Sequence, residues 1–416
     1  MKIRPLHLMP AALALALAGC GDDSVTVSNA EDVLPQLGAA TGVTLANCAT
    51  LASAFTFANT TVTAAEVITA GTLSNAGQPV GEHCRITGRM NQRVSTVDGQ
   101  TYAIGFEMRM PKDWSGRFLY QGNGGIDGVV STADGGNSIG SGGILKNGLQ
   151  LGFAIISSDA GHSSAQNPLF GVDPQARLDY GYKAVGSLTP MAKALIRAAY
   201  GKGPDRSYIG GTSNGGRHAM VAAARYASEY DGILANSPGF NLPKAAVAQL
   251  WGVQQYAKVS TGTITSLTNA SGQASTVSLP DVATSFTPTE LNMVSAKILA
   301  KCDALDGTAD GWVGDVAACQ GAFSVAADVP SCTGARDGTC LTAAQKTVLT
   351  DVHTGARNSA GQPLYASFPY DQGIKSTSSA GWAAWKFANA TGLGRDPGAT
   401  AFIFTSPPLI SPRLTP

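Results

Sequence analysis

The segment of residues 208–218 contains a serine in a setting that favours nucleophilic chemistry. It reads YIGGTSNGGRH and places Ser213 in the pattern G-x-S-x-G. In this pattern the serine occupies a strained turn between a strand and a helix, so the residues two before and two after it must be small, as Gly211 and Gly215 are. The helix expected from Asn214 directs its free amides toward the serine oxygen, which favours developing negative charge. The segment therefore predicts acyl transfer through Ser213.

A second glycine-rich segment, YQGNGGIDG at residues 120–128, directly follows an expected strand. Glycine backbone there can approach a substrate closely, as in the glycine loops that supply an oxyanion donor in esterases. We therefore predict an oxyanion hole formed by the backbone amides of Asn214 and Gly125. The alternative is a phosphate-binding loop, but the segment lacks the Lys and Ser/Thr residues of that motif.

The elements that must position these groups alternate between strands and helices from about residue 84 to 240. The sequence pattern predicts strands at 84–90, 102–110, 117–120, 152–158, 207–210 and 232–236, and helices at 178–200 and 214–227. Such alternation is typical of an α/β fold in which a mostly parallel sheet is covered by helices on both faces.

The composition changes after Pro238, where Thr, Ser and Ala become common and Asp-Gly pairs and four cysteines appear. We therefore expect a core at residues 45–240 and a separate, loop-rich lid at 241–400. Residues 401–416 begin like a further core strand, with the apolar run FIF, before prolines interrupt it.

Residues 1–20 have the pattern of an export signal. They combine a basic start, an apolar run too short to span a bilayer comfortably, and small residues before Cys20. The ending LAGC resembles a bacterial lipobox, in which the cysteine is lipidated; the alternative is an ordinary secretory signal with a chance cysteine. Residues 21–44 are expected to form a flexible tether. The predicted location is the bacterial cell envelope or the exterior, with the membrane contacted only through an N-terminal lipid anchor.

Six cysteines remain after Cys20, and an oxidising compartment would allow them to pair. Sequence proximity suggests three disulfides, although six cysteines permit fifteen connectivities. A zinc cluster is the competing interpretation, but no C-x-x-C pair is present and histidine is scarce. The suggested pairs are Cys48 with Cys84, Cys302 with Cys319 and Cys332 with Cys340.

The overall composition fits a packed globular protein, with 44% hydrophobic and 13% charged residues in 416. Lys plus Arg and Asp plus Glu both number 28, and no basic block is present. Nucleic acid is therefore not an expected partner. The oligomeric state stays open.

Several runs, in order, resemble the tannase and feruloyl esterase family. They include SSDAGH at 157–162, SYIGGTSNGGRH at 207–218, YDGILANSP at 230–238 and KCDALDGTADGW at 301–312. The resemblance implies an α/β-hydrolase core interrupted by a large lid, with a Ser-His-Asp triad that cleaves carboxylic esters of aromatic acids of hydroxycinnamic or gallic type. A small aromatic ester is the implied substrate.

Two features depart from the family's pattern. Family members usually carry a cysteine immediately before the nucleophile, where this chain has Thr212. The acid and the histidine of the triad are expected after the lid, and the chain reaches Pro416 before either motif, so we expect a truncated core and impaired activity. Neither His162, at the end of a strand, nor His353, in an expected lid helix, is a convincing replacement base, and His218 lies on the side of its helix turned away from Ser213.

The resemblance also implies a structural calcium site in the acidic loop 302–315. Calcium favours several oxygen ligands from a flexible loop. Matched to the family's calcium loop, the side chains of Asp303, Asp306 and Asp310 and the carbonyls of Thr308 and Trp312 would bind the ion. A solvated Asp-Gly turn is the alternative.

Two other functions remain open at this point. One is a catalytically inactive remnant or binding lipoprotein that retains the lid and a ligand pocket. The other keeps ester hydrolysis but changes the substrate to polyester or hydroxybutyrate oligomers. Arg217, four residues after Ser213, is more typical of a surface ion pair than of a substrate contact.

Overall fold

The computed structural model describes residues 37–136, 146–265, 267–268, 274–275, 278–376, 378, 381–388 and 395–409. Residues 1–39 form one unit and residues 40–416 a second, which contains the elements of the fold. The predicted signal peptide, Cys20 and most of the predicted tether lie outside the described residues, as do residues 410–416 at the end of the chain.

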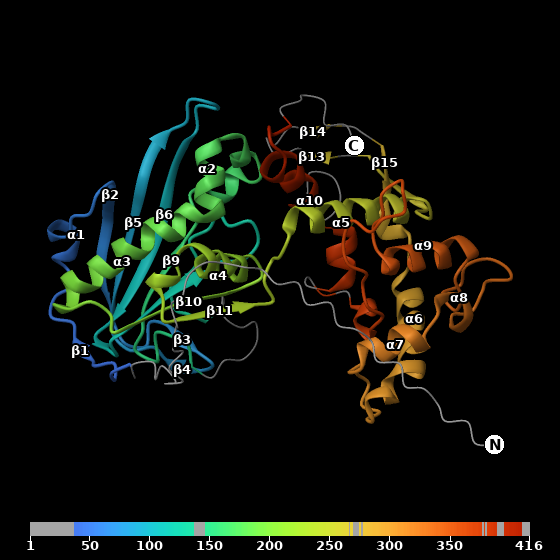
Figure 1. The fold of residues 1–416 in the computed structure, drawn as a ribbon, viewed down its shortest axis with the longest axis horizontal. Coiled ribbons are helices and arrows are strands. Elements are labelled where there is room, and N and C mark those ends of the chain that lie inside the picture. The colour runs from blue at the N-terminus through green and yellow to red at the C-terminus, as the bar shows by residue number, and fades with distance from the viewer. Residues whose placement is uncertain are drawn as a thin grey trace, which may run out of the picture. The chain divides into compact units, whose positions relative to one another are not determined.

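A seven-stranded sheet with the order β11-β10-β8-β9-β6-β5-β2 forms the centre of the first part of this unit (Figure 1). Its strands are β2 (Thr60–Ile68), β5 (His83–Val94), β6 (Thr101–Pro111), β8 (Arg117–Gly122), β9 (Ala154–Ser158), β10 (Arg206–Thr212) and β11 (Gly232–Asn236). Two-stranded pairs join β1 (Val43–Thr44) to β7 (Asp113–Trp114) and β3 (Ser74–Asn75) to β4 (Gln78–Pro79).

The sheet is mixed. The pairs β11 with β10, β10 with β8 and β8 with β9 are parallel, whereas β9 with β6, β6 with β5 and β5 with β2 are antiparallel. The predicted α/β fold is confirmed, but parallel pairing is confined to the half of the sheet that contains β8–β11. The short connection of residues 95–100 explains part of the difference, because strands joined by a short turn run antiparallel.

Helices cover this sheet. They are α1 (Leu51–Ala54), α2 (Pro174–Leu178), a π-helical segment η3 (Asp179–Lys183), α3 (Ala184–Tyr200) and α4 (Asn214–Arg225). The helix predicted at 178–200 is thus the end of a continuous helical stretch over 174–200, and α4 matches the helix predicted at 214–227 to within two residues. Short 3-10 turns occur at Ser164–Gln166, Leu169–Val172 (η2) and Ala227–Glu229. No helix among the described residues is long and apolar enough to cross a membrane.

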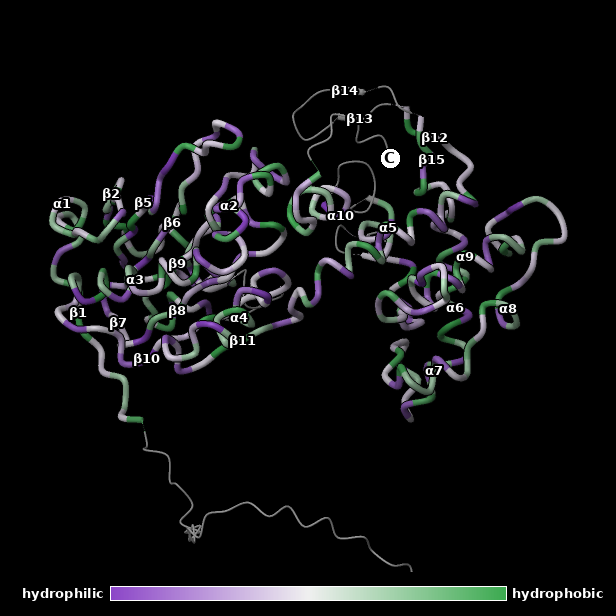
Figure 2. The backbone as a smooth tube through the Cα atoms, turned by 45° about the horizontal axis from the view of Figure 1, so that its top comes forward, coloured by the Kyte–Doolittle hydropathy of each residue, from purple (hydrophilic) through white to green (hydrophobic). Residues whose placement is uncertain are grey.

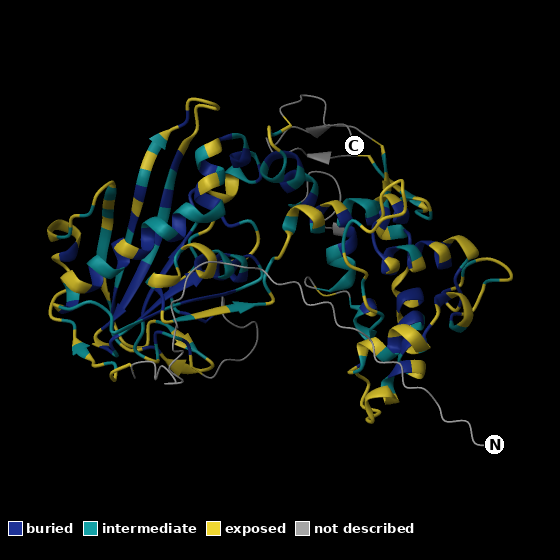
Figure 3. Ribbon diagram, viewed as in Figure 1, coloured by how far each residue is buried: buried dark blue, intermediate teal, exposed yellow. Residues whose placement is uncertain are grey.

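The hydrophobic core lies between the sheet and these helices. All five residues of β9 are buried, whereas β2, at one edge, has no buried residue (Figure 3). The Cys48–Cys84 disulfide connects the segment before α1 to β5. At the other edge β11 pairs on one side only among the described residues, and Ile233 and Leu234 are 37% and 49% exposed there.

The chain after Asn241 forms a helical region with a hydrophobic core of its own. Its helices are α5 (Leu242–Ala257), α6 (Pro288–Cys302), α7 (Val316–Ala322), α8 (Val325–Asp328) and α9 (Ala343–Thr354), with 3-10 or π turns at Val282–Thr284, Asp303–Asp306, Gln372–Lys375 and Ala384–Ala388. Its short strands are β12 (Gly262–Ile264), β13 (Leu267–Thr268), β14 (Ala274–Ser275) and β15 (Leu279–Asp281). Disulfides join Cys302 to Cys319 and Cys332 to Cys340, so all three pairs follow sequence proximity.

This region is more helical than its loop-rich composition indicates. Green and purple segments are interspersed along its helices in Figure 2, as expected of helices with one buried face. Two of the helices start with a capping box, Thr287 with Glu290 and Thr342 with Gln345. Such caps satisfy backbone amides that the first helical turn leaves without partners.

The segment 395–404 is helical, comprising α10 (Arg395–Gly398) and the π-helical η9 (Ala399–Phe404), so the strand expected at its end is wrong. An apolar run as short as FIF fits either a strand or a buried helical turn, and its surroundings decide. Here Gly171 packs so closely on the Phe402 carbonyl that a side chain at 171 would collide with it. Arg177 Nη1 donates to the Thr405 carbonyl (3.1 Å), so the segment is fastened to the α2 region.

A buried ion pair anchors α6 within the helical region. The Glu290 carboxylate is completely buried, and it accepts hydrogen bonds from Arg336 Nε (2.8 Å), Arg336 Nη2 (2.6 Å) and Gln345 Nε2 (3.2 Å). Burial works to raise the pKa of Glu290, but the bonds from Arg336 and from the Thr287 amide outweigh it and hold the pKa below its usual value.

We predict that Glu290→Ala destabilises the protein by about 3 kcal/mol, because the buried Gln345 amide and Arg336, which is 22% exposed, both lose their acceptor. The matched control is Glu66→Ala, since Glu66 pairs with Arg85 on the surface, with both side chains more than a third exposed; its effect should stay below about 1 kcal/mol. Urea denaturation followed by circular dichroism measures both. The Glu290 contribution is present at neutral pH and is lost as the pH falls through the lowered pKa. Equal midpoints for the two variants would contradict the prediction.

Candidate active site

Ser213 lies at a tight turn between β10 and α4. Its backbone angles are φ 59° and ψ −118°, a conformation that non-glycine residues rarely adopt. The Ser213 amide donates to the Asn236 carbonyl (3.1 Å), and the Ser213 carbonyl accepts from the amides of Arg217 (3.0 Å) and Gly239 (2.8 Å). In the part of the chain that the structure describes, no side chain hydrogen bonds to its hydroxyl. The turn is therefore held by its backbone.

Three glycines allow this turn to form. A Cβ atom at Gly211 would lie 2.5 Å from the Gly215 carbonyl carbon, and a Cβ at Gly122, at the end of β8, would lie 2.8 Å from the Gly215 carbonyl oxygen. A Cβ at Gly215 would in turn collide with the Gly122 carbonyl. The geometry thus accounts for Gly211 and Gly215 as predicted, and it adds Gly122, which sequence reasoning missed.

Thr212 directly precedes Ser213 in the chain. Its hydroxyl oxygen accepts a hydrogen bond from Asn236 Nδ2 (3.1 Å), at the end of β11. A polar bond between neighbouring strands therefore lies where the family's usual pattern has a cysteine.

The loop after β8 lies beside the first turn of α4. The Asn123 carbonyl accepts from Asn214 Nδ2 (3.3 Å), and Gly125, Asp127 and Gly128 all have positive φ, at 68°, 58° and 94°. Gly125 is exposed, with open space next to its α carbon. The structure therefore brings the start of this loop to Asn214, whereas the role of Gly125 as an oxyanion donor stays a prediction.

A buried carboxylate connects this loop to α4. Asp127 Oδ2 accepts from Asn214 Nδ2 and from His218 Nε2, both at 2.8 Å, and Arg217 Nη2 lies 4.0 Å away. The Asp127 side chain is 1% exposed. His218 lies on the side of α4 turned away from Ser213, as predicted from the helix geometry, and bonds to Asp127. The sequence did not identify Asp127 as its partner.

Arg217 is a structural residue of the turn rather than half of a surface ion pair. Its Nε donates to Asn214 Oδ1 (2.7 Å), and its Nη atoms donate to the carbonyls of Gly181 (3.1 Å) and Tyr180 (2.9 Å). The Tyr180 hydroxyl donates to the same Asn214 oxygen (3.2 Å). Asn214 is therefore held from both ends of its amide group.

The four described histidines are all buried and bonded away from Ser213. His162 Nε2 contacts the Ile126 carbonyl (2.9 Å), His83 lies between the Gly81 carbonyl and Arg109 (both 2.8 Å), and His353 Nδ1 contacts the Phe368 carbonyl (3.2 Å). Burial is the largest cause that lowers the pKa of each ring, and it lowers that of His353 to about 4.

Asp159 is a further carboxyl group near the loop, and it is partly buried. Its Oδ1 accepts from the amides of Gly105 and Gly161, both at 2.9 Å, and its own carbonyl accepts from the Gly128 amide (3.1 Å). Burial raises the pKa of Asp159 to about 7, against the effect of the two amides. The carboxyl group thus supports the loop and its neighbouring strand rather than facing Ser213.

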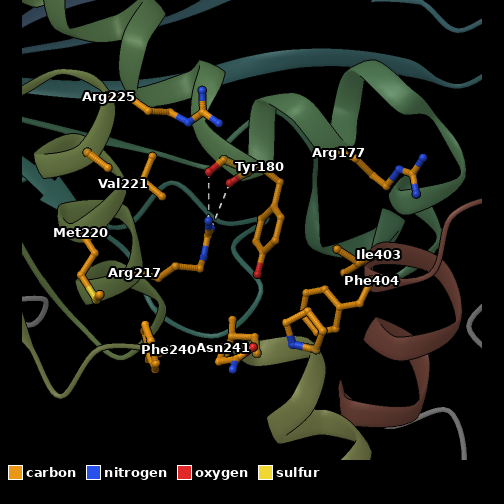
Figure 4. Close-up of a pocket in the computed structure, with 15 residues that line it drawn as sticks. Arg177, Tyr180, Arg217, Met220, Val221, Arg225, Phe240, Asn241, Ile403 and Phe404 are labelled. Carbon is orange, nitrogen blue, oxygen red and sulfur yellow. Dashed lines mark hydrogen bonds between the residues drawn. The ribbon is translucent and has the colours of Figure 1, made fainter.

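A pocket of about 460 Å³ starts one helical turn beyond Ser213. Figure 4 shows the rings of Tyr180 and Phe404 on one side of it and Met220 and Phe240 on the other. Ser213 does not line the pocket. Gly239 does line it, and its amide donates to the Ser213 carbonyl. The described lining contains no acidic residue and three arginines, which are Arg177, Arg217 and Arg225.

The acidic loop does not gather its carboxylates in this conformation. Asp303 Oδ1 accepts from the amides of Asp310 (3.2 Å) and Gly311 (2.9 Å), and Asp306 Oδ1 accepts from the Thr308 amide (2.9 Å). Asp310 Oδ1 accepts from the Trp312 amide (3.1 Å). Within the described residues no group of three or more Asp, Glu, His or Cys side chains is arranged to hold a metal ion. The carboxylates cap their own loop, which the Cys302–Cys319 disulfide closes.

Residues 84–404 match the sequence profile of a family described as "Tannase and feruloyl esterase". The chain is 39% identical to a mono(2-hydroxyethyl) terephthalate hydrolase from Piscinibacter sakaiensis in an alignment of 333 residues that covers 76% of this chain and 52% of the relative. It is 28% identical to a probable feruloyl esterase B-1 from Neosartorya fischeri over 284 residues, 68% of this chain and 47% of the relative. The chain thus spans about half the length of the curated relatives it matches.

Solved structures of similar proteins share the fold. Feruloyl esterase B from Aspergillus oryzae superposes with a TM-score of 0.65 at 24% identity, over 86% of this chain and 64% of that one. A tannin acyl hydrolase from Aspergillus niger superposes with a TM-score of 0.53 at 20% identity, over 83% of this chain and 65% of that one.

We predict that Gly215→Ala destabilises the protein by about 3 kcal/mol or more, because the new methyl group collides with the backbone of Gly122. The matched control is Gly252→Ala, in the interior of α5, where a Cβ atom has nothing within 4 Å. Alanine favours a helix over glycine, so the control should leave the melting temperature unchanged or raise it. Differential scanning calorimetry compares the two, and a Gly215→Ala protein as stable as the control would show that the turn is not closely packed.

Proposed function

The chain belongs to the tannase and feruloyl esterase family, and on that premise we propose that it hydrolyses carboxylic esters through an acyl-enzyme on Ser213. The observation that carries the proposal is the conformation of Ser213, held at φ 59° between β10 and the first turn of α4. Such a turn exposes the hydroxyl at the end of the strand and directs helix amides at the reacting group.

In the proposed reaction, Ser213 Oγ attacks the ester carbonyl carbon and passes its proton to a water molecule, which later returns a proton to the leaving alcohol. The carbonyl oxygen becomes an oxyanion, which accepts hydrogen bonds from the backbone amides of Asn214 and Gly125. Collapse of this intermediate breaks the bond to the alcohol, and the alcohol leaves with a proton. Water then cleaves the acyl-enzyme by the same steps in reverse order.

The described residues do not supply a proton acceptor for Ser213. Among the described residues no histidine or carboxylate hydrogen bonds to the Ser213 hydroxyl. A serine without a neighbouring base is a weak nucleophile at neutral pH. We therefore propose that the chain as given acylates slowly, although it carries the turn and the helix amides.

We propose esters of aromatic acids of the hydroxycinnamic or gallic type as substrates. Two relatives are named feruloyl esterase and terephthalate hydrolase. The pocket beside the turn supports an aromatic acid, because the rings of Tyr180, Phe240 and Phe404 contribute to its lining and its volume suits a single substituted ring.

We also propose that the chain is exported and anchored through a lipid on Cys20. Three disulfides support export, because such bonds persist in an oxidising compartment. The anchor rests on the sequence LAGC at residues 17–20 alone.

Finally, we propose that the acidic loop binds a structural calcium ion. Three aspartates on one loop closed by a disulfide support the proposal. Because their oxygens cap backbone amides in the present conformation, the loop must rearrange to bring Asp303, Asp306 and Asp310 around one ion.

The nucleophile is tested by adding imidazole as an external base. We predict that hydrolysis of a p-nitrophenyl ester by the protein rises with imidazole concentration, above the rate with imidazole alone, and that Ser213→Ala abolishes this excess. The reason is that the added base accepts the serine proton, which the described residues do not. The matched control is Ser237→Ala, since Ser237 also has positive φ (39°) at the end of a core strand. The control should keep the full excess rate. Equal rates for the Ser213→Ala variant and the unaltered chain would contradict the nucleophile assignment.

The same assay compares substrates. Methyl ferulate and methyl gallate should be cleaved faster than a hydroxybutyrate dimer, because the pocket presents aromatic rings to an aromatic acid. A preference for the hydroxybutyrate dimer would favour a polyester or hydroxybutyrate-oligomer esterase instead. Binding of aromatic acids without any excess hydrolysis would favour an inactive binding protein.

Calcium is tested by thermal unfolding. We predict that calcium at 100 times its dissociation constant stabilises the protein by about 2.7 kcal/mol relative to EGTA, because the ion binds only the folded loop. Asp303→Asn should remove the shift in melting temperature. Asp337→Asn is the control, because Asp337 also caps an amide of its own turn, at Thr339 (2.9 Å), but lies outside the loop. A melting temperature that is equal in calcium and EGTA would contradict the site.

A further inference from the structure

We propose that Asp127 and His218 form a positioning pair, which holds the two backbone amides of the proposed oxyanion hole in one fixed arrangement. The inference rests on the proposed function, because it assigns a role in the reaction of Ser213. Neither residue contacts the reacting atoms in this proposal. They act through the loop 123–128 and through Asn214.

A single carboxylate oxygen joins the two parts of the oxyanion hole. Asp127 Oδ2 accepts from the Asn214 side chain and from His218 Nε2, both at 2.8 Å. Asn214 provides one of the proposed oxyanion amides, and Gly125, which provides the other, lies in the turn that the Asp127 amide closes on the Gly124 carbonyl (3.3 Å). A movement of Asp127 therefore shifts both amides relative to each other.

Burial makes this arrangement specific. The Asp127 side chain is 1% exposed and that of His218 is 4% exposed, so water cannot replace a lost hydrogen bond. The nearest guanidinium nitrogen, on Arg217, is 4.0 Å away, beyond hydrogen-bond distance. A buried carboxylate that loses a donor is strongly destabilised, so other positions of the loop are disfavoured.

The protonation of His218 follows from the same contacts. Nε2 must carry the hydrogen that it donates to Asp127, and Nδ1 is buried without a hydrogen-bond partner. A neutral ring satisfies both conditions, because an unprotonated Nδ1 has no hydrogen to donate. Burial also lowers the pKa of His218, against the attraction of Asp127. His218 is therefore a neutral donor in the pair.

The loop needs such support because Asp127, at φ 58°, has a backbone conformation that residues with a side chain rarely adopt, whereas glycine adopts it without strain. Gly125, Asp127 and Gly128 all have positive φ, and Asp127 is the one among these three that carries a side chain. The outer side of the turn is open, since Gly124 and Gly125 are exposed with no atom near their Cβ positions. The loop is therefore held on its buried side, by the Asp127 side chain and by the bond from His162 to the Ile126 carbonyl.

The test measures how fast a fluorophosphonate labels Ser213, with the unaltered chain as reference and intact-protein mass spectrometry as readout. Phosphonylation develops negative charge on the same oxygen position as acylation. We expect Asp127→Ala and His218→Leu to lower the maximal labelling rate about 100-fold without changing the half-saturating probe concentration, because a small displacement of reacting groups has an effect of that size. Asp127→Asn, which keeps an acceptor oxygen, and His218→Gln, which keeps a donor, should restore most of the rate.

The matched control is Asp173→Ala. Asp173 is also a buried carboxylate, which pairs with Arg93 and caps α2, but it does not contact the loop. Its loss should lower the melting temperature and leave the labelling rate of the folded protein unchanged. A merely structural role for Asp127 predicts the same behaviour as this control, and that outcome overturns the proposal.

Amide hydrogen exchange provides a readout that does not need a reactive serine. In Asp127→Ala, or in Asp127→Asn if the alanine variant does not fold, residues 123–128 and 214–218 should exchange faster together, while β9 stays protected. Absence of labelling at Ser213 in the unaltered chain would count against the proposed function. Unchanged exchange in both segments would overturn the positioning pair itself, whatever the labelling shows.

Discussion

The close backbone contact between the ends of β8 and β10 and the first turn of α4 is the constraint on which the site depends. Gly122, Gly211 and Gly215 meet without side chains, and any Cβ atom there would enter the space of another backbone. The contact lets the chain reverse at Ser213 in a conformation with positive φ. A larger residue would push α4 away from the sheet, and the amides of its first turn would then move away from Ser213.

Features that depend on neighbouring residues could be predicted from the sequence. The spacing of Gly211, Ser213 and Gly215 sets the turn, because the collision to be avoided lies within one turn of chain. The disulfides follow proximity for a similar reason: Cys332 and Cys340 are 8 residues apart, and Cys302 and Cys319 are 17 apart. Short loops bring such pairs together at low entropic cost.

Features that depend on distant segments could not be predicted. Asp127 and His218 are 91 residues apart, and only the register of β8 against β10 brings their segments together. Two other features could not be predicted for the same reason: the antiparallel half of the sheet and the helical segment Ala399–Phe404. Apolar runs of equal length fit a parallel strand, an antiparallel strand or a buried turn. A glycine-rich loop that contains one aspartate was the only local signal for the Asp127 contact.

Acyl transfer requires a proton acceptor and a stabilised oxyanion, and the described histidines do not supply the first. Proton transfer needs a ring whose pKa lies near the working pH and whose nitrogen reaches the serine hydroxyl. In all four described rings burial lowers the pKa, and each ring bonds to a carbonyl, an arginine or a carboxylate elsewhere. Stabilisation of the oxyanion needs only fixed amides, and in the proposed mechanism these come from α4 and the loop after β8. The hydrogen bonds of Asn214 and Asp127 hold the described part of the proposed oxyanion hole in place, and none of them involves a proton acceptor for Ser213.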